Sequence, residues 1–125
     1  MRLATDRFYR LDTCFCPLPC GEIFYYPPAF TADSQKILHN TVAADNLIEA
    51  TEEDAARFCV NAVCIDRTLV MAEATDRLRG VMSDRGYTDS QVNLDPFILP
   101  GGGAYCMTLR LDRGPLSGVT KVKPR

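Results

Sequence analysis

Cys106 is the residue of this sequence best placed for nucleophilic chemistry. It follows three consecutive glycines, 101–103, within the stretch 99–112, which reads L-P-G-G-G-A-Y-C-M-T-L-R-L-D. Because glycine has no Cβ, such a run lets the backbone adopt positive φ and pass close to another group. A thiol that attacks a substrate needs this kind of access. The stretch therefore predicts a reactive cysteine; the alternative is a glycine-rich hairpin in which Cys106 only packs.

The residues around and after Cys106 alternate between apolar and polar side chains. One face of an extended chain would carry Met107, Leu109 and Leu111, and the other would carry Thr108, Arg110 and Asp112. Period-two alternation predicts a strand with one buried face. We therefore expect Cys106 at the mouth of a strand.

The rest of the chain contains two similar units. In the first unit, strands are expected at 10–17, 22–26 and 46–50, with a helix from Thr31 or Asp33 to about Thr41 before the third strand. In the second, strands are expected at 60–66, 68–72 and 91–94, with a helix from Thr75 to about Arg85. Between them, 51–54 resembles a capping box that opens a short helix to Phe58. A strand-strand-helix-strand order that repeats after about 50 residues indicates a modular α/β architecture.

Composition and charge narrow the class of protein. The 125 residues are 46% hydrophobic and 24% charged, with a formal net charge of −2. These are values for one globular domain, and the small mixed charge argues against a surface for nucleic acid or an anionic membrane. The sequence has no apolar run long enough to span a membrane and no signal-peptide pattern. We therefore expect a cytoplasmic protein without membrane or nucleic-acid partners.

The six cysteines do not have the spacing of a metal site. Without a secretion signal we expect reduced thiols rather than disulfides. Cys14, Cys16 and Cys20 have the spacing C-x-C-x3-C, and Cys59 and Cys64 the spacing C-x4-C; structural zinc sites use paired C-x2-C motifs. The single histidine, His39, falls on the polar side of a predicted helix. We therefore expect no metal and no cofactor.

Three residues at the starts of successive units are candidates for a shared site. Asp12 and Asn61 begin the two units, and Cys106 begins the final strand. A ring of such units would direct all three towards one axis. The alternatives are a solvated strand-edge carboxylate at Asp12 and a turn or cap residue at Asn61.

Two segments of the chain resemble a known family. The segment 7–15, R-F-Y-R-L-D-T-C-F, and the segment 101–109, G-G-G-A-Y-C-M-T-L, together resemble the C-terminal part of the guanidine-modifying superfamily. This superfamily includes amidinotransferases, arginine deiminases and dimethylarginine dimethylaminohydrolases. The resemblance implies a pentein, a five-bladed α/β propeller, of which roughly residues 7–112 would form two units plus the final strand. On this basis 1–112 is a partial pentein domain. The remaining residues, 113–125, are polar and contain Gly and Pro, so we expect them to form a flexible tail.

The resemblance also implies roles for individual residues. Cys106 matches the family's nucleophile, which attacks the guanidinium carbon and forms a covalent amidino-thioether. Asp12 matches the carboxylate that binds the substrate guanidinium. A carboxylate suits a planar cation, and a thiolate is a strong nucleophile. The implied partner is a small guanidino substrate of the arginine or methylarginine type.

Arg10 departs from the family pattern, which has H-L-D where this chain has R-L-D. Arginine stays protonated and cannot replace a histidine that transfers protons, and its charge would repel a guanidinium. The family units that supply a catalytic glutamate and a second substrate-binding carboxylate precede the matched stretch. We therefore expect an amidinohydrolase- or amidinotransferase-like chain that is inactive alone. The alternatives are a non-catalytic pentein remnant with an interaction or structural role, and a thiol redox or metal protein.

Two units taken from a ring of five would leave apolar side chains on both flanks partly uncovered. The side chains expected there are Phe24, Tyr25, Val63, Ile65, Val70 and Leu109. Open sheet edges and apolar patches are rarely tolerated in monomers. We therefore expect a homo-oligomer or a separate chain that carries the missing units.

Overall fold

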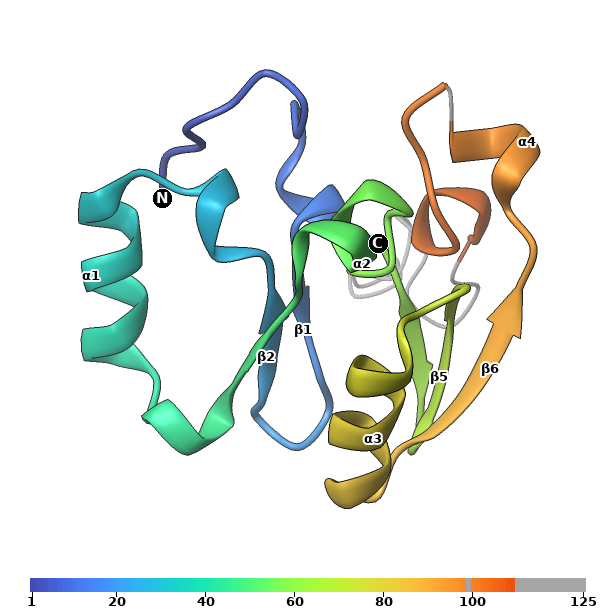
Figure 1. Cartoon of the computed structure of the whole chain (residues 1–125). Helices are drawn as coiled ribbons and strands as arrows, with labels where there is room; N and C mark the ends of the chain where they lie inside the picture. The colour runs from blue at the N-terminus through green and yellow to red at the C-terminus, as the bar shows by residue number, and fades with distance from the viewer. Residues whose placement is uncertain (99, 110–125) are drawn as a thin grey trace, which may run out of the picture.

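The structure is a computed structural model that describes residues 1–98 and 100–109. Its elements form two consecutive units, which lie next to each other in Figure 1. The first unit contains β1 (Phe15–Pro17), β2 (Ile23–Tyr25), α1 (Ala32–Thr41) and β3 (Leu47–Glu49). The second contains β4 (Val63–Ile65), β5 (Thr68–Ala72), α3 (Asp76–Asp84) and β6 (Thr88–Val92). Helix α2 (Glu52–Ala56) joins the units, and α4 (Asp95–Ile98) follows β6.

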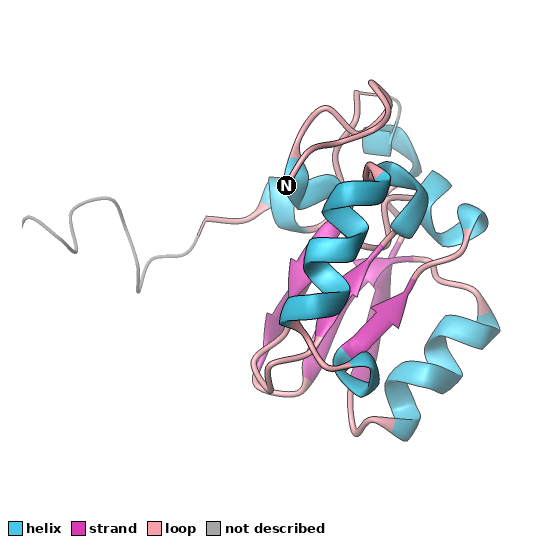
Figure 2. Ribbon diagram, turned by 90° about the vertical axis from the view of Figure 1, so that its left-hand side faces the viewer, coloured by secondary structure: helices cyan, strands magenta, loops and turns pink. Residues whose placement is uncertain are grey.

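Both units have the same sheet topology. Each sheet has three strands, in the orders β1-β2-β3 and β4-β5-β6. The first two strands of each sheet pair antiparallel, and the second and third pair parallel. Because parallel neighbours need a crossover, a helix precedes each third strand, and Figure 2 shows α1 in front of the strands. The predicted α/β class and its repeat are confirmed, and the arrangement fits a partial pentein-like fold.

Threonine caps begin the helices where the sequence predicts them. The side chains of Thr31 and Thr75 accept hydrogen bonds from the backbone N–H groups three residues later, at the starts of α1 and α3. Thr51 and Asp54 form the predicted capping box of α2. Helix α3 ends shortly before Gly86, whose φ of +83° suits a residue without a Cβ. No helix of the described residues is long and apolar enough to cross a membrane.

The strand predicted at 10–17 is wrong in its first half. Leu11–Thr13 is a single 3-10 turn, and β1 begins only at Phe15. The hydroxyl and the backbone N–H of Thr13 both donate to the carbonyl of Arg10, at 2.6 and 3.2 Å. A threonine side chain that satisfies a carbonyl three residues earlier stabilises a local turn in competition with a strand.

The strand predicted from Met107 onwards is also wrong within the described residues. Tyr105–Met107 is a 3-10 turn, and the Thr108 hydroxyl donates to the Tyr105 carbonyl at 2.9 Å. Met107 and Leu109, expected on a buried face, are 52% and 78% exposed. Cys106 therefore lies in a turn rather than at a strand mouth. The expected strand positions 110–112 and the expected tail 113–125 lie outside the described residues.

Other predicted boundaries shift by a few residues. Helix α2 ends at Ala56 rather than Phe58, whose φ is +55°. Strand β4 begins at Val63 because the preceding residues form turns, and β6 covers Thr88–Val92 rather than 91–94. Ile37 of α1 is 55% exposed, although an apolar side chain on a helix of this length usually faces the core.

One hydrophobic core joins the two units. The first unit contributes Phe24, Tyr25 and Ile48, and the second contributes Leu69, Met71, Leu78 and Met82. The expectation that Phe24 and Tyr25 are uncovered is wrong, because both are completely buried within this chain. Ile65 and Leu109 are exposed and Val63 and Val70 are partly exposed, as expected.

Glu22 connects the two units through polar contacts. Its carboxylate accepts hydrogen bonds from the Tyr87 hydroxyl at 2.5 Å and from Arg85 Nη1 at 3.0 Å. Burial opposes ionisation of Glu22, but these two hydrogen bonds outweigh it and hold the pKa of Glu22 below its usual 4.5. The ionised carboxylate therefore stabilises the contact between the units.

We expect Glu22→Gln to lower the free energy of unfolding by about 1.5–3 kcal/mol at neutral pH, the range for hydrogen bonds to a charged group. Folding lowers the pKa of Glu22. The ionised carboxylate therefore stabilises the fold at pH values above its unfolded-state pKa, and this stabilisation is lost as the pH falls through the lower folded-state pKa. Urea unfolding near pH 7 and near pH 3 measures the difference. An equal loss at both pH values would show that ionisation of Glu22 contributes nothing.

Candidate active site

Arg10, Asp12 and Cys106 contact one another although Cys106 lies far away in the sequence. Arg10 Nη2 donates to Cys106 Sγ at 2.6 Å and to Asp12 Oδ2 at 3.0 Å. Cys106 Sγ donates to Asp12 Oδ2 at 3.4 Å. Arg10 and Cys106 are exposed, and Asp12 is half-buried. The structure thus brings all three predicted site residues together, and their chemical roles stay predictions.

Asn61 links the two segments that carry these residues. Its side chain is completely buried. Asn61 Nδ2 donates to the Asp12 carbonyl at 2.8 Å and to Asp12 Oδ2 at 3.4 Å. Asn61 Oδ1 accepts from the backbone N–H groups of Gly103 and Cys106, at 3.0 and 3.1 Å. The position of the Cys106 thiol relative to the Asp12 carboxylate is therefore set by one buried amide.

The glycine run has a packing function in addition to its flexibility. A Cβ at Gly103 would lie 2.9 Å from the Phe58 carbonyl and 3.0 Å from Asn61 Cβ, too close for any other residue type without a shift of the backbone. Gly101 has a φ of +93°, which glycine adopts without strain. Two of the three glycines thus allow the 103–106 segment to reach Asn61.

Tyr9 is a neighbour of the site that the sequence reasoning did not single out. Its hydroxyl donates to the Gly101 carbonyl at 3.4 Å. The Arg10 guanidinium carbon lies 5.6 Å from the centre of the Tyr9 ring, within the range of a cation–π contact. The ring is 61% exposed. The only feature of the sequence that could have indicated Tyr9 as a site residue is its position next to Arg10.

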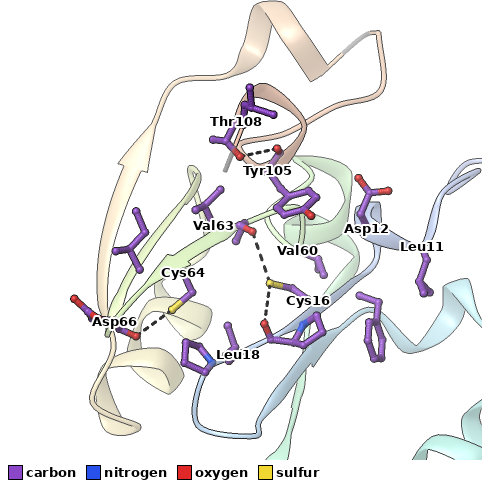
Figure 3. A pocket seen from close by; sticks show the side chains of 16 residues that line it. Leu11, Asp12, Cys16, Leu18, Val60, Val63, Cys64, Asp66, Tyr105 and Thr108 are labelled. Carbon is purple, nitrogen blue, oxygen red and sulfur yellow. Dashed lines mark hydrogen bonds between the residues drawn. The ribbon is translucent and has the colours of Figure 1, made fainter. Parts of the chain in front are cut away.

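A largely apolar groove of about 1290 Å³ runs from the site between β1 and β4. Figure 3 shows Asp12 and Tyr105 at one end of this groove and Cys64 and Asp66 towards the other. Cys16 lies between these ends, where its thiol donates to the Ala62 carbonyl at 3.7 Å. The first strands of the two units therefore form the walls of one continuous depression.

The other cysteines differ from Cys106 in their environment. Burial raises the pKa of Cys14, Cys16 and Cys59 to about 12 in each case. Burial also raises the pKa of the Cys64 thiol. Cys20 is exposed, like Cys106. His39 is exposed on α1, as the sequence predicts.

Solved structures with a similar fold include an arginine dihydrolase of cyanobacteria. The chain superposes on the N-terminal domain of the arginine dihydrolase ArgZ with a TM-score of 0.85 and 38% identity, over 87% of this chain and 40% of that one. That structure is a cysteine-to-serine variant bound to substrate. AgrE in complex with ornithine and NAD⁺ matches with a TM-score of 0.85 and 39% identity, over 87% of this chain and 16% of AgrE.

Curated relatives lead to the same family. The bifunctional arginine dihydrolase/ornithine cyclodeaminase AgrE of a Nostoc species is 39% identical over 111 residues, which are 89% of this chain and 16% of AgrE. The N(G),N(G)-dimethylarginine dimethylaminohydrolase of Mycobacterium tuberculosis is 31% identical over 111 residues, 89% of this chain and 36% of that protein. No family model matches the chain. These relatives are guanidine-modifying enzymes, which confirms the resemblance, and the chain spans well under half of their length.

We expect Asn61→Ala to lower the free energy of unfolding by roughly 3–5 kcal/mol, because it leaves the Gly103 and Cys106 N–H groups and the Asp12 carbonyl without their partner. Asn61→Asp should also destabilise, since a carboxylate cannot donate to Asp12. Asn40→Ala, at an exposed position of α1, is the control and should change stability little. Urea unfolding measures all three, and a loss below about 1 kcal/mol for Asn61→Ala would contradict the role of this amide.

Alkylation by iodoacetamide should rank the six thiols by environment. We expect Cys106 to react faster than Cys20, because Cys106 is exposed and its sulfur accepts a hydrogen bond from the Arg10 guanidinium. Cys14, Cys16 and Cys59 should be slowest, since burial raises their pKa to about 12. Peptide mapping after short exposures gives the six rates. A Cys106 rate among the slow group would exclude a prepared nucleophile.

Proposed function

We propose that this chain provides the nucleophilic part of an enzyme that acts on guanidino substrates of the arginine or methylarginine type. The observation that carries the proposal is the 3.4 Å contact between Cys106 Sγ and Asp12 Oδ2 across two segments joined by Asn61. The relatives are named as an arginine dihydrolase and a dimethylarginine dimethylaminohydrolase. Both names describe enzymes that act on a guanidino group.

In the proposed reaction, the Cys106 thiolate attacks the guanidinium carbon and a C–N bond breaks, which leaves a covalent amidino-thioether. Water then cleaves the C–S bond and restores the thiolate. Two displacements of this kind replace one difficult step. The Asp12 carboxylate would hold the planar cation through charge-assisted hydrogen bonds. A solved variant of the N-terminal domain of ArgZ is covalently bonded to a reaction intermediate, which supports a covalent route in the family.

Arg10 limits what the chain can do alone. The leaving nitrogen needs a proton, and the family resemblance assigns proton transfer to a histidine at the position of Arg10. An arginine side chain does not release its proton near neutral pH. The glutamate and the second substrate-binding carboxylate of the family belong to units that precede the matched stretch. We therefore propose that the chain by itself does not turn over substrate.

The remaining units of a five-bladed propeller would complete the site. We propose that residues 1–112 form the last part of such a propeller, with 113–125 as a tail. The apolar groove between β1 and β4, together with exposed Ile65 and Leu109, supports further protein on this side. Further copies of this chain, or a chain that carries the other units, would supply it. The six cysteines are free, which suits a reducing compartment such as the cytoplasm.

A non-catalytic role is the second candidate. It is favoured by the Arg10–Asp12 ion pair, with its N–O distance of 3.0 Å. An ion pair at this position satisfies Asp12 without any substrate. In that case the chain would serve as an interaction or structural module of the pentein type.

We expect the purified chain to release no detectable citrulline from arginine or dimethylarginine, and Arg10→His alone to restore none, because the other carboxylates are still missing. A colorimetric citrulline assay measures both proteins. Release by the wild-type chain would contradict the proposed dependence on further units.

A chimaera separates the missing histidine from the missing units. In it, this chain replaces the segment of the ArgZ N-terminal domain that it matches. We expect the chimaera with Arg10→His to hydrolyse arginine, and the chimaera with Arg10 to be at least about 100-fold slower, as for loss of a general acid–base. Cys106→Ala in the active chimaera should abolish turnover. A folded Arg10→His chimaera without activity would favour the non-catalytic role.

A further inference from the structure

We propose that the Arg10 side chain occupies the guanidinium subsite of this chain as a built-in ligand. A free guanidinium compound would then bind beside Cys106 and Asp12 only when Arg10 leaves. The inference deepens the proposed function, on which it rests, because it assigns both the ligand class of the subsite and a contact that blocks it.

The geometry around Arg10 is that of a bound guanidinium. A single nitrogen, Nη2, contacts both the Cys106 sulfur, at 2.6 Å, and Asp12 Oδ2, at 3.0 Å. The Tyr9 ring lies 5.6 Å from the guanidinium carbon. A carboxylate, a sulfur and an aromatic ring are the groups that a planar cation can pair with at once. A substrate guanidinium placed for attack by Cys106 would need the same space.

Two other arginine–carboxylate pairs of the described residues lack this combination. Arg57 Nη1 lies 3.2 Å from Glu73, and Arg79 Nε lies 2.9 Å from Asp89. Neither guanidinium donates to a cysteine sulfur in the part of the chain that the structure describes. Arg57 is otherwise similar to Arg10, since their side chains are 45% and 48% exposed. The thiol contact therefore distinguishes Arg10 from an ordinary surface ion pair.

Because the backbone holds Arg10 close to Asp12, Arg10 is a competitor that a substrate must displace. Arg10 lies two residues before Asp12, so its local concentration at the subsite is high whatever the concentration of protein. A ligand that binds only the open form has its apparent affinity reduced by the fraction of open form. Because nearly half of the side chain is exposed, Arg10 can leave the subsite without disturbing the core. The contact is therefore autoinhibitory and reversible.

Titration with guanidinium chloride, at constant ionic strength with potassium chloride, tests the proposal by NMR. The probes are the backbone amides of Gly103 and Cys106, which donate to Asn61. We expect Arg10→Ala to show saturable shifts of these amides at millimolar guanidinium, far below denaturing concentrations. If Arg10 fills the subsite in about nine molecules of ten, the wild-type chain should need roughly tenfold more guanidinium than Arg10→Ala to reach the same fraction of the maximal shift.

Three variants serve as controls. Arg57→Ala removes an arginine of matched exposure and should titrate like the wild type. Arg10→Gln keeps the side chain as far as Cδ but lacks the guanidinium, and it replaces Arg10→Ala if the latter does not fold. Adding Asp12→Asn to Arg10→Ala should abolish saturable binding, because it removes the carboxylate that pairs with the cation.

Equal titration of the wild type and Arg10→Ala, or binding that does not depend on Asp12, would overturn the proposal. The outcome is independent of turnover. Guanidinium binding by Arg10→Ala together with an inactive Arg10→His chimaera would uphold the subsite and contradict the proposed function. An active chimaera with no guanidinium binding by either Arg10 variant would uphold the proposed function and contradict the subsite.

Discussion

A buried carboxamide must have its polar atoms paired within the protein, because an unpaired buried group costs roughly 1–3 kcal/mol. Asn61 meets this requirement with groups from two other segments: Asp12 accepts, and the N–H groups of Gly103 and Cys106 donate. The 10–13 turn, the 103–106 segment and the start of the second unit therefore cannot move independently. The separation of the Cys106 thiol and the Asp12 carboxylate follows from this one amide.

The repeat explains why Asp12, Asn61 and Cys106 meet although they lie far apart in the sequence. It is also the part of the fold that the sequence predicts well. Threonine caps, a capping box and Gly86 mark the helices, and strand patterns of similar spacing mark the sheets. The turns at Leu11–Thr13 and Tyr105–Met107 could not be predicted from alternation, because the same residues fit a strand equally well. In each turn, the hydroxyl of Thr13 or Thr108 donates to the carbonyl three residues earlier. These hydrogen bonds decide between the two conformations.

Tertiary contacts decide the features that sequence reasoning missed. The requirement for glycine at position 103 comes from the Phe58 carbonyl and Asn61, which lie more than 40 residues away. The complete burial of Phe24 and Tyr25 depends on the second unit covering the first, whereas reasoning from a ring of five left their faces open. Tyr9 acquires a possible role only because Arg10 turns towards Cys106. No local pattern encodes these contacts.

The resemblance implies that Arg10 stands at the position of the family's histidine, and such a replacement has two physical consequences with one origin. A guanidinium keeps its proton near neutral pH, so the position can no longer supply a general acid. The same group is chemically the cation that Asp12 is suited to bind, and its tether holds it within reach. A lysine would also keep its charge, but a compact ammonium does not match the planar group of a guanidino substrate. Loss of proton transfer and occupation of the subsite are therefore expected together from this one substitution, and Arg10→His is expected to reverse both.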